Sequence, residues 1–154
     1  MRRLIIIFLF LAVFGGTDLT LAKDIKVAKP RDIISFIANS QSELVLVNFW
    51  ASWCPPCRME IPSLIKLRTI FPRQKLSILG VSVDYDPEMF FAFYKETNFN
   101  YPVWLGKESV GDFFQVVNLP KLEIYRSSGE KVFTHEGYMG LEELKIKIEE
   151  LLGE

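Results

Sequence analysis

Two cysteines, Cys54 and Cys57, lie three residues apart and are the only cysteines among 154 residues. An apolar run typical of a buried strand, Leu44 to Trp50, precedes them, and a run with helical character, Arg58 to Ile70, follows them. At the start of a helix, unpaired backbone N–H groups and the positive end of the macrodipole favour a thiolate. The thiolate is the reactive form of cysteine. The spacing therefore predicts a redox-active pair at a strand-to-helix junction, and the fold has to provide that junction.

The N-terminal residues 1–22 have the layout of a secretory signal. Arg2 and Arg3 precede an apolar run from Leu4 to Phe14, and small residues near the end of the segment offer a cleavage site. The apolar run is about half as long as the roughly 20 residues that a membrane-spanning helix needs. We therefore expect an exported protein, periplasmic or otherwise extracytoplasmic, whose mature domain is 23–154. An uncleaved signal that anchors the domain to the membrane is the alternative.

Composition excludes several classes of function. A hydrophobic fraction of 49% in a chain of this length fits one domain with a substantial core. The net charge is −1 and no basic stripe is present, so nucleic acid is not an expected partner. The sequence also lacks a glycine-rich phosphate loop, which argues against nucleotide chemistry.

Other uses of the cysteine pair fit the sequence less well. An inert disulfide that closes so short a loop would contribute only roughly 2 kcal/mol, against roughly 3 kcal/mol for a 15-residue loop. Zinc usually needs four ligands, and the two cysteines with the single histidine, His135, supply only three. Covalent haem attachment needs a histidine directly after the second cysteine, where this chain has Arg58. We expect no metal or other cofactor and a structural role for His135. Copper(I) held by two thiolates remains an alternative.

Hydrophobic periodicity and turn signals divide the chain into alternating strands and helices. This order predicts the α/β class, with a parallel sheet covered by helices and a closing antiparallel hairpin that turns at 127–130. An apolar stripe, Met89, Phe90, Phe93 and Tyr94, is predicted to face the core. We expect strands at 24–28, 44–50, 76–83, 122–125 and 131–135, helices at 30–38, from the cysteines to 71, at 87–97 and 141–152, a short extended piece at 101–105 and a short helix at 109–115.

Three segments, 47–57, 60–62 and 116–120, resemble the thioredoxin superfamily and within it the TlpA/ResA/CcmG branch of exported thiol–disulfide oxidoreductases. The resemblance covers nearly all of the expected mature chain. It implies a thioredoxin-like fold, a central mixed β-sheet flanked by helices on both faces. Asn118 and Lys121 depart from the branch, which often has Gly and then Thr or Glu there. We therefore expect altered contacts with the substrate around the proline between them.

The resemblance also implies the function and the partners. Members of this branch are mostly reductases of protein disulfides, recharged by a membrane electron donor, and serve apocytochrome c maturation or a similar pathway. We expect a monomer whose partners are protein thiols and disulfides, associated with the membrane at most weakly through its N-terminal segment. A disulfide oxidase or isomerase, and a chaperone that holds an apoprotein or copper(I) with the same cysteines, are the alternatives.

Catalysis is predicted to use Cys54, Cys57 and Glu60. Cys54, at the exposed helix start, attacks a partner's disulfide, and the more buried Cys57 resolves the mixed disulfide. Glu60 lies one turn after Cys57 and can accept or deliver the proton of the Cys57 thiol. The resemblance implies that a glutamate at this position lies at the active site. The alternative is that Glu60 is a solvent-exposed helix residue without a catalytic role. Asn48 stands where cytoplasmic thioredoxins carry a buried acid, which strengthens the case for Glu60.

Substrate binding is predicted to involve residues on both sides of the cysteines. The Pro55-Pro56 spacer stiffens the loop, and Trp53 shields the disulfide and forms part of the docking surface. By resemblance, the bond between Leu119 and Pro120 is cis, and the backbone of Leu119 pairs with an extended substrate peptide.

Overall fold

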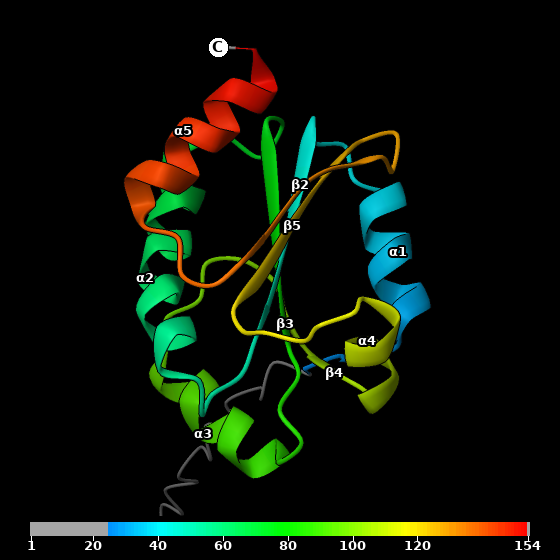
Figure 1. Cartoon of the computed structure of the whole chain (residues 1–154), viewed down its shortest axis with the longest axis vertical. Helices are drawn as coiled ribbons and strands as arrows, with labels where there is room; N and C mark the ends of the chain where they lie inside the picture. Colours follow the sequence, from blue (N-terminus) through cyan, green and yellow to red (C-terminus); the bar gives the residue numbers. More distant parts are fainter. Residues whose placement is uncertain (1–24, 154) are drawn as a thin grey trace, which may run out of the picture.

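The computed structural model describes residues 25–153, which form a six-stranded sheet with helices packed on both faces (Figure 1). The signal predicted for 1–22 lies outside the described residues. The sheet has the strand order β1-β4-β3-β2-β5-β6. In chain order the elements are β1 (Val27–Ala28), α1 (Pro30–Ala38), β2 (Leu44–Trp50), α2 (Pro55–Ile70), β3 (Leu76–Ser82), α3 (Pro87–Glu96), β4 (Val103–Gly106), α4 (Glu108–Phe113), β5 (Lys121–Arg126), β6 (Lys131–Glu136) and α5 (Leu141–Leu152).

The central strand is β2, and all seven of its residues are buried. It runs parallel to β3, from Leu44 opposite Leu76 to Trp50 opposite Ser82, and antiparallel to β5. Strands β1, β4, β3 and β2 are parallel, whereas β5 and β6 form the closing hairpin, so the predicted mixed sheet is confirmed. The piece expected to be merely extended at 101–105 overlaps a true strand, β4, because its backbone pairs with both β1 and β3.

Side chains of β2 alternate between two hydrophobic cores, one on each face of the sheet. Leu46 and Trp50 pack with α2 and α5, which lie on one side of the sheet in Figure 1. Val47 and Phe49 pack with α1 and α4 on the other side. Asn48 therefore shares the face of Leu46 and Trp50 and is directed toward α2.

Local capping explains where α2 and α3 begin. Cys54 is the N-cap of α2, where its Sγ accepts a hydrogen bond from the Cys57 N–H at 3.3 Å, and prolines occupy the first helical positions. Asp86 caps α3 in the same way, its carboxylate accepting from the N–H of Glu88 at 2.9 Å.

The apolar stripe of α3 is only partly in the core. Phe90 is fully buried, and Phe93 and Tyr94 pack against the first core as partly buried side chains. Met89 is 42% exposed, so the prediction was wrong for this residue. A ten-residue helix at the end of the sheet buries only a narrow stripe, and Met89 lies outside it.

Gly80 of β3 is required by close packing on the α2 face. A Cβ atom at this position would lie 3.2 Å from Tyr101, 3.3 Å from Trp50 and 3.3 Å from Val103. We expect Gly80→Ala to lower the free energy of unfolding by about 1–3 kcal/mol, the usual cost of overpacking a tight core. Urea denaturation of the purified domain measures this change.

The matched control is Gly111→Ala in α4, where a Cβ meets no atom within 4 Å. This change should raise the free energy of unfolding by about 0.5–1 kcal/mol, because alanine is the better helix former. Equal effects at the two glycines would contradict the packing explanation for Gly80.

Candidate active site

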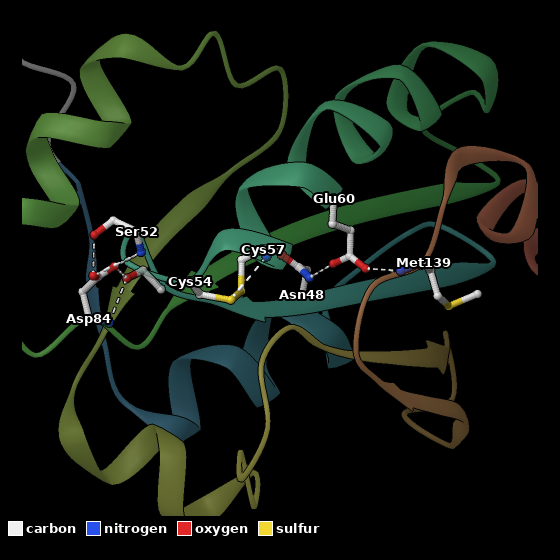
Figure 2. The surroundings of a disulfide bond; sticks show 8 residues. Asn48, Ser52, Cys54, Cys57, Glu60, Asp84 and Met139 are labelled. Atoms are coloured by element: carbon white, nitrogen blue, oxygen red, sulfur yellow. Dashed lines mark hydrogen bonds between the residues drawn. A yellow bond between two sulfur atoms is a disulfide. The ribbon is translucent and has the colours of Figure 1, made fainter.

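Cys54 and Cys57 form a disulfide at the start of α2 (Figure 2). Cys57 is fully buried, as predicted, and Cys54 is the more accessible of the two. Cys54 is nevertheless only 4% exposed, less than expected for a residue at a helix start. Cys54 is less exposed than expected because Trp53 and Leu119 line the same groove beside it. Only a small part of Cys54 is therefore accessible from outside.

Glu60 lies on the inner side of the disulfide, fully buried beneath it. Its Oε2 accepts a hydrogen bond from Asn48 Nδ2 at 2.7 Å, and its Oε1 accepts one from the Met139 N–H at 2.9 Å (Figure 2). Residues three apart on a helix are surface neighbours, so Glu60 adjoins Cys57. The alternative of a solvated Glu60 is thus wrong. Met139 contributes through its backbone, from the bend between β6 and α5, and no local sequence signal marks it.

Burial raises the pKa of Glu60 to about 7, while the hydrogen bonds from the Met139 N–H and the Asn48 amide act in the opposite direction. A carboxyl group with a pKa in this range can release and accept a proton near neutral pH. The Oδ1 of Asn48 has no hydrogen-bond partner within the described part of the chain. If the side-chain amide of Asn48 flips, Oδ1 can accept a hydrogen bond from the protonated carboxyl group of Glu60. Asn48 can therefore bind either protonation state of the acid.

Asp84, at the end of β3, fixes the turn that precedes Cys54. Its carboxylate accepts hydrogen bonds from the Ser52 N–H at 2.9 Å, from Ser52 Oγ at 2.6 Å and from Ser82 Oγ at 2.5 Å (Figure 2). Asp84 was not among the site residues predicted from the sequence. Its position directly after a buried parallel strand was the available signal, since the carboxyl ends of parallel strands meet at one edge of the sheet.

Four of the five predicted substrate-binding residues line one groove with Cys54, namely Trp53, Pro55, Pro56 and Leu119. The bond between Leu119 and Pro120 is cis, as predicted. Leu119 lines a groove beside the disulfide, whereas Pro120 is buried beneath the loop. We call this the Cys54 groove; its volume is about 460 Å³, and it is lined by Trp53, Cys54, Pro55, Pro56, Val83, Val116, Val117, Asn118 and Leu119.

The two departures from the family pattern have different positions. Asn118 lines the Cys54 groove and donates a hydrogen bond to Glu136 at 2.7 Å. Lys121 is buried and does not line the Cys54 groove, so altered substrate contacts at this residue stay a prediction. Its Nζ donates to the carbonyl of Phe114 at 2.6 Å and pairs with Glu123 at 3.3 Å. Lys121 thus holds the chain where it enters the loop of the groove.

Other candidate features of the described residues lie outside this site. The ring of His135 stacks in parallel on Phe133 at 6.3 Å, consistent with the structural role expected for it. Between residues 25 and 153, no three His, Cys, Asp or Glu side chains gather closely enough to hold a metal ion. Within the same range, none of the helices has the length and apolar character needed to cross a membrane.

Comparisons with known proteins agree with this geometry. Residues 21–129 match the model of the AhpC/TSA family. The chain is 28% identical over 118 residues to the thioredoxin-like protein YneN of Bacillus subtilis, covering 75% of this chain and 69% of YneN. It is 31% identical over 104 residues to the thiol-disulfide oxidoreductase ResA of the same organism, covering 67% of this chain. It thereby spans only 58% of the length of that relative.

Solved structures establish the architecture. The crystal structure of a thiol:disulfide interchange protein DsbE from Chlorobium tepidum superimposes with a TM-score of 0.69 at 21% identity, covering 76% of this chain and 85% of that one. StoA from Bacillus subtilis superimposes with a TM-score of 0.60 at 24% identity, covering 70% and 84%. The thioredoxin-like fold expected from the sequence is thereby confirmed.

The raised pKa of Glu60 makes a prediction about stability. Between pH 4.5 and about 7 the native state holds the Glu60 proton and the unfolded state releases it, so the free energy of unfolding falls as pH rises through this window. The loss for this one group is about 3 kcal/mol. In Glu60→Gln this contribution should be absent. Urea denaturation of the oxidised wild type and of oxidised Glu60→Gln at several pH values compares how their free energies of unfolding change with pH.

Glu130→Gln, at an exposed position in the hairpin turn, is the control and should keep the pH dependence of the wild type. If Glu60→Gln and the wild type lost stability equally over this window, the buried carboxyl group would not be its source.

Proposed function

We propose that this chain, which belongs to the AhpC/TSA family, is a thiol–disulfide oxidoreductase that reduces disulfide bonds in other proteins. The observation that carries the proposal is a Cys54–Cys57 disulfide at a helix start with the buried carboxyl group of Glu60 behind it. An inert disulfide needs no group that exchanges protons near neutral pH. A redox couple does, because its thiols gain and lose protons in each cycle.

The reaction proceeds in two exchanges. In the reduced protein, the Cys54 thiolate attacks one sulfur of a partner's disulfide, and the partner's other sulfur leaves as a thiolate that takes up a proton. The Cys57 thiolate then attacks the Cys54 sulfur, which releases the partner as a dithiol. The product is the Cys54–Cys57 disulfide, the form seen in the structure. Two electrons from a dithiol donor restore the reduced protein.

Glu60 serves the second exchange. Cys57 is fully buried, so its proton has no direct route to solvent. The neighbouring carboxylate accepts that proton as Cys57 becomes a nucleophile and returns it when the couple is reduced again. Asn48 supports both states, donating to the carboxylate and accepting from the acid.

The same carboxyl group favours reduction over oxidation as the net direction. Strongly oxidising couples owe their potential to a stabilised reduced form with a low thiol pKa. A buried acid beside Cys57 disfavours a second negative charge there, which destabilises the thiolate and makes the couple more reducing. The sequence resemblance to the TlpA/ResA/CcmG branch supports the same direction.

The N-terminal segment and the resemblance extend the proposal to the setting of the reaction. Residues 1–22 direct export, so the domain acts in the periplasm or an equivalent compartment, as a monomer. A membrane protein supplies the electrons. Cytochrome c maturation is the process that we assign to it, because reduction of apocytochrome cysteines must precede haem attachment.

The direct test is reduction of insulin disulfides with dithiothreitol as the electron source. The mature wild-type protein should accelerate the reaction, Cys54→Ser should abolish the acceleration, and Glu60→Gln should slow it by about 100-fold, a typical effect of losing a positioned proton acceptor. In the native cell, Cys57→Ala should accumulate mixed disulfides, whose partners mass spectrometry identifies.

Persistent turnover by Cys54→Ser would refute the assignment of the nucleophile. Stoichiometric copper(I) binding by the reduced protein, without disulfide exchange, would identify the cysteines as metal ligands instead. A midpoint potential far above that of glutathione would indicate an oxidase.

A further inference from the structure

Gly111 stands in the middle of α4, where the fold does not require a glycine. Its φ is not positive, and a Cβ added there would meet no atom within 4 Å. A glycine inside a helix costs about 0.5–1 kcal/mol relative to alanine. Neither backbone conformation nor packing accounts for this cost. An open position without a Cβ atom also leaves room for the backbone of another molecule to approach closely.

Gly111 lines a second surface groove, which we call the α4 groove, with a volume of about 630 Å³. The floor and walls include the side chains of Val27 and Leu105, and Tyr85, which is 80% exposed, also lines it. Figure 1 shows that α4 and the turn from β2 into α2 lie at the same end of the sheet. The α4 groove therefore opens near the disulfide.

The α4 groove adjoins the Cys54 groove. Val83 and Val116 line both. Along one side, the ring of Trp53 in the first groove lies 6.1 Å from the ring of Tyr85 in the second, so an aromatic wall passes from one to the other. We call the two adjoining grooves together the channel, and Cys54 lines its first part.

The channel is mainly apolar. All residues that line the Cys54 groove are uncharged. Among those that line the α4 groove, the charged ones are Lys107 and Glu108 at the start of α4 and the buried Asp84. The Asp84 carboxylate already accepts hydrogen bonds from Ser52 and Ser82. A chain lying in the channel would meet valines, leucine and aromatic rings over most of its path.

We propose that the α4 groove binds the polypeptide segment next to the target cysteine of the partner protein, in an extended conformation and with apolar side chains. The inference rests on the proposed function, because the mixed disulfide fixes the partner's sulfur at Cys54 and its flanking residues must leave along the surface. The channel offers those residues an apolar path, and Gly111 admits their backbone. Partner selection thereby depends on the sequence beside the cysteine as well as on the disulfide.

The test compares small and extended disulfides with the same leaving group. The protein used is Cys57→Ala, so that Cys54 is its single thiol. Its thiolate attacks either dithiobis(nitrobenzoic acid) or a peptide whose cysteine carries the same nitrothiobenzoate group. The peptide has about ten residues, which at about 3.3 Å per residue is long enough to follow the channel. Each reaction forms one disulfide to Cys54 and releases one coloured thiolate. One pair of peptides places valines either before or after the cysteine, and a second pair has glutamates at the same positions.

Gly111→Leu adds a large side chain at a position that lines the α4 groove. We expect it to slow attack on one valine peptide by about tenfold and to leave the small disulfide within about twofold of the parent rate. Ser109→Leu, which adds the same side chain at an exposed position of α4 outside the groove, should behave like the parent. The glutamate peptides should react more slowly than their valine counterparts.

Several outcomes would overturn the proposal. One is an equal rate for Gly111→Leu and the parent with both valine peptides; another is no preference for valine over glutamate peptides. Dimerisation that Gly111→Leu abolishes would identify a second copy as the occupant. If Gly111→Leu did not fold, Tyr85→Ser at its exposed position should slow the same peptide. Failure of the parent to attack even the small disulfide would refute the proposed function instead, so the two failures are distinguishable.

Discussion

The carboxyl group of Glu60 is the point at which three parts of the fold meet. It joins the central strand through Asn48, the redox helix through its own backbone, and the bend before α5 through the Met139 N–H. A buried acid is costly unless it is hydrogen bonded, and both of its oxygens are. The surroundings satisfy the acid while leaving its pKa near 7. The position of α5 and the proton chemistry beside Cys57 therefore depend on the same interaction.

Two further buried polar contacts hold the segments on the outer side of the disulfide. Asp84 binds the turn before Cys54 through Ser52, and Lys121 binds the backbone before the Leu119 loop through the carbonyl of Phe114. The walls of the Cys54 groove are thus fixed from below, by groups that do not line its surface at the sulfur. A groove with fixed walls is pre-organised for an extended chain, which lowers the entropic cost of binding one.

Much of the fold could be predicted from the sequence. The bounds of β2 and α5 agree with the structure to the residue, because an unbroken apolar run and an amphipathic helix between glycines are strong local patterns. The cysteine pair and its place at a helix start were equally local. Errors occurred where the sheet or the core decided the outcome. The strand β4 was taken as an extended piece because four residues carry little pattern, and Met89 was placed in the core because periodicity alone does not give the width of the buried stripe.

By itself, the sequence determined the redox pair, the order of most elements and the candidacy of Glu60, since each of these depends on residues close together along the chain. The tertiary structure decided that Glu60 is buried, that Met139 and Asn48 bind it, and that Lys121 supports the loop from behind. It also joined two grooves at Val83 and Val116, residues that are far apart in sequence. These results depend on which strands become neighbours and which side chains lose contact with water, and no single segment of the chain contains that information.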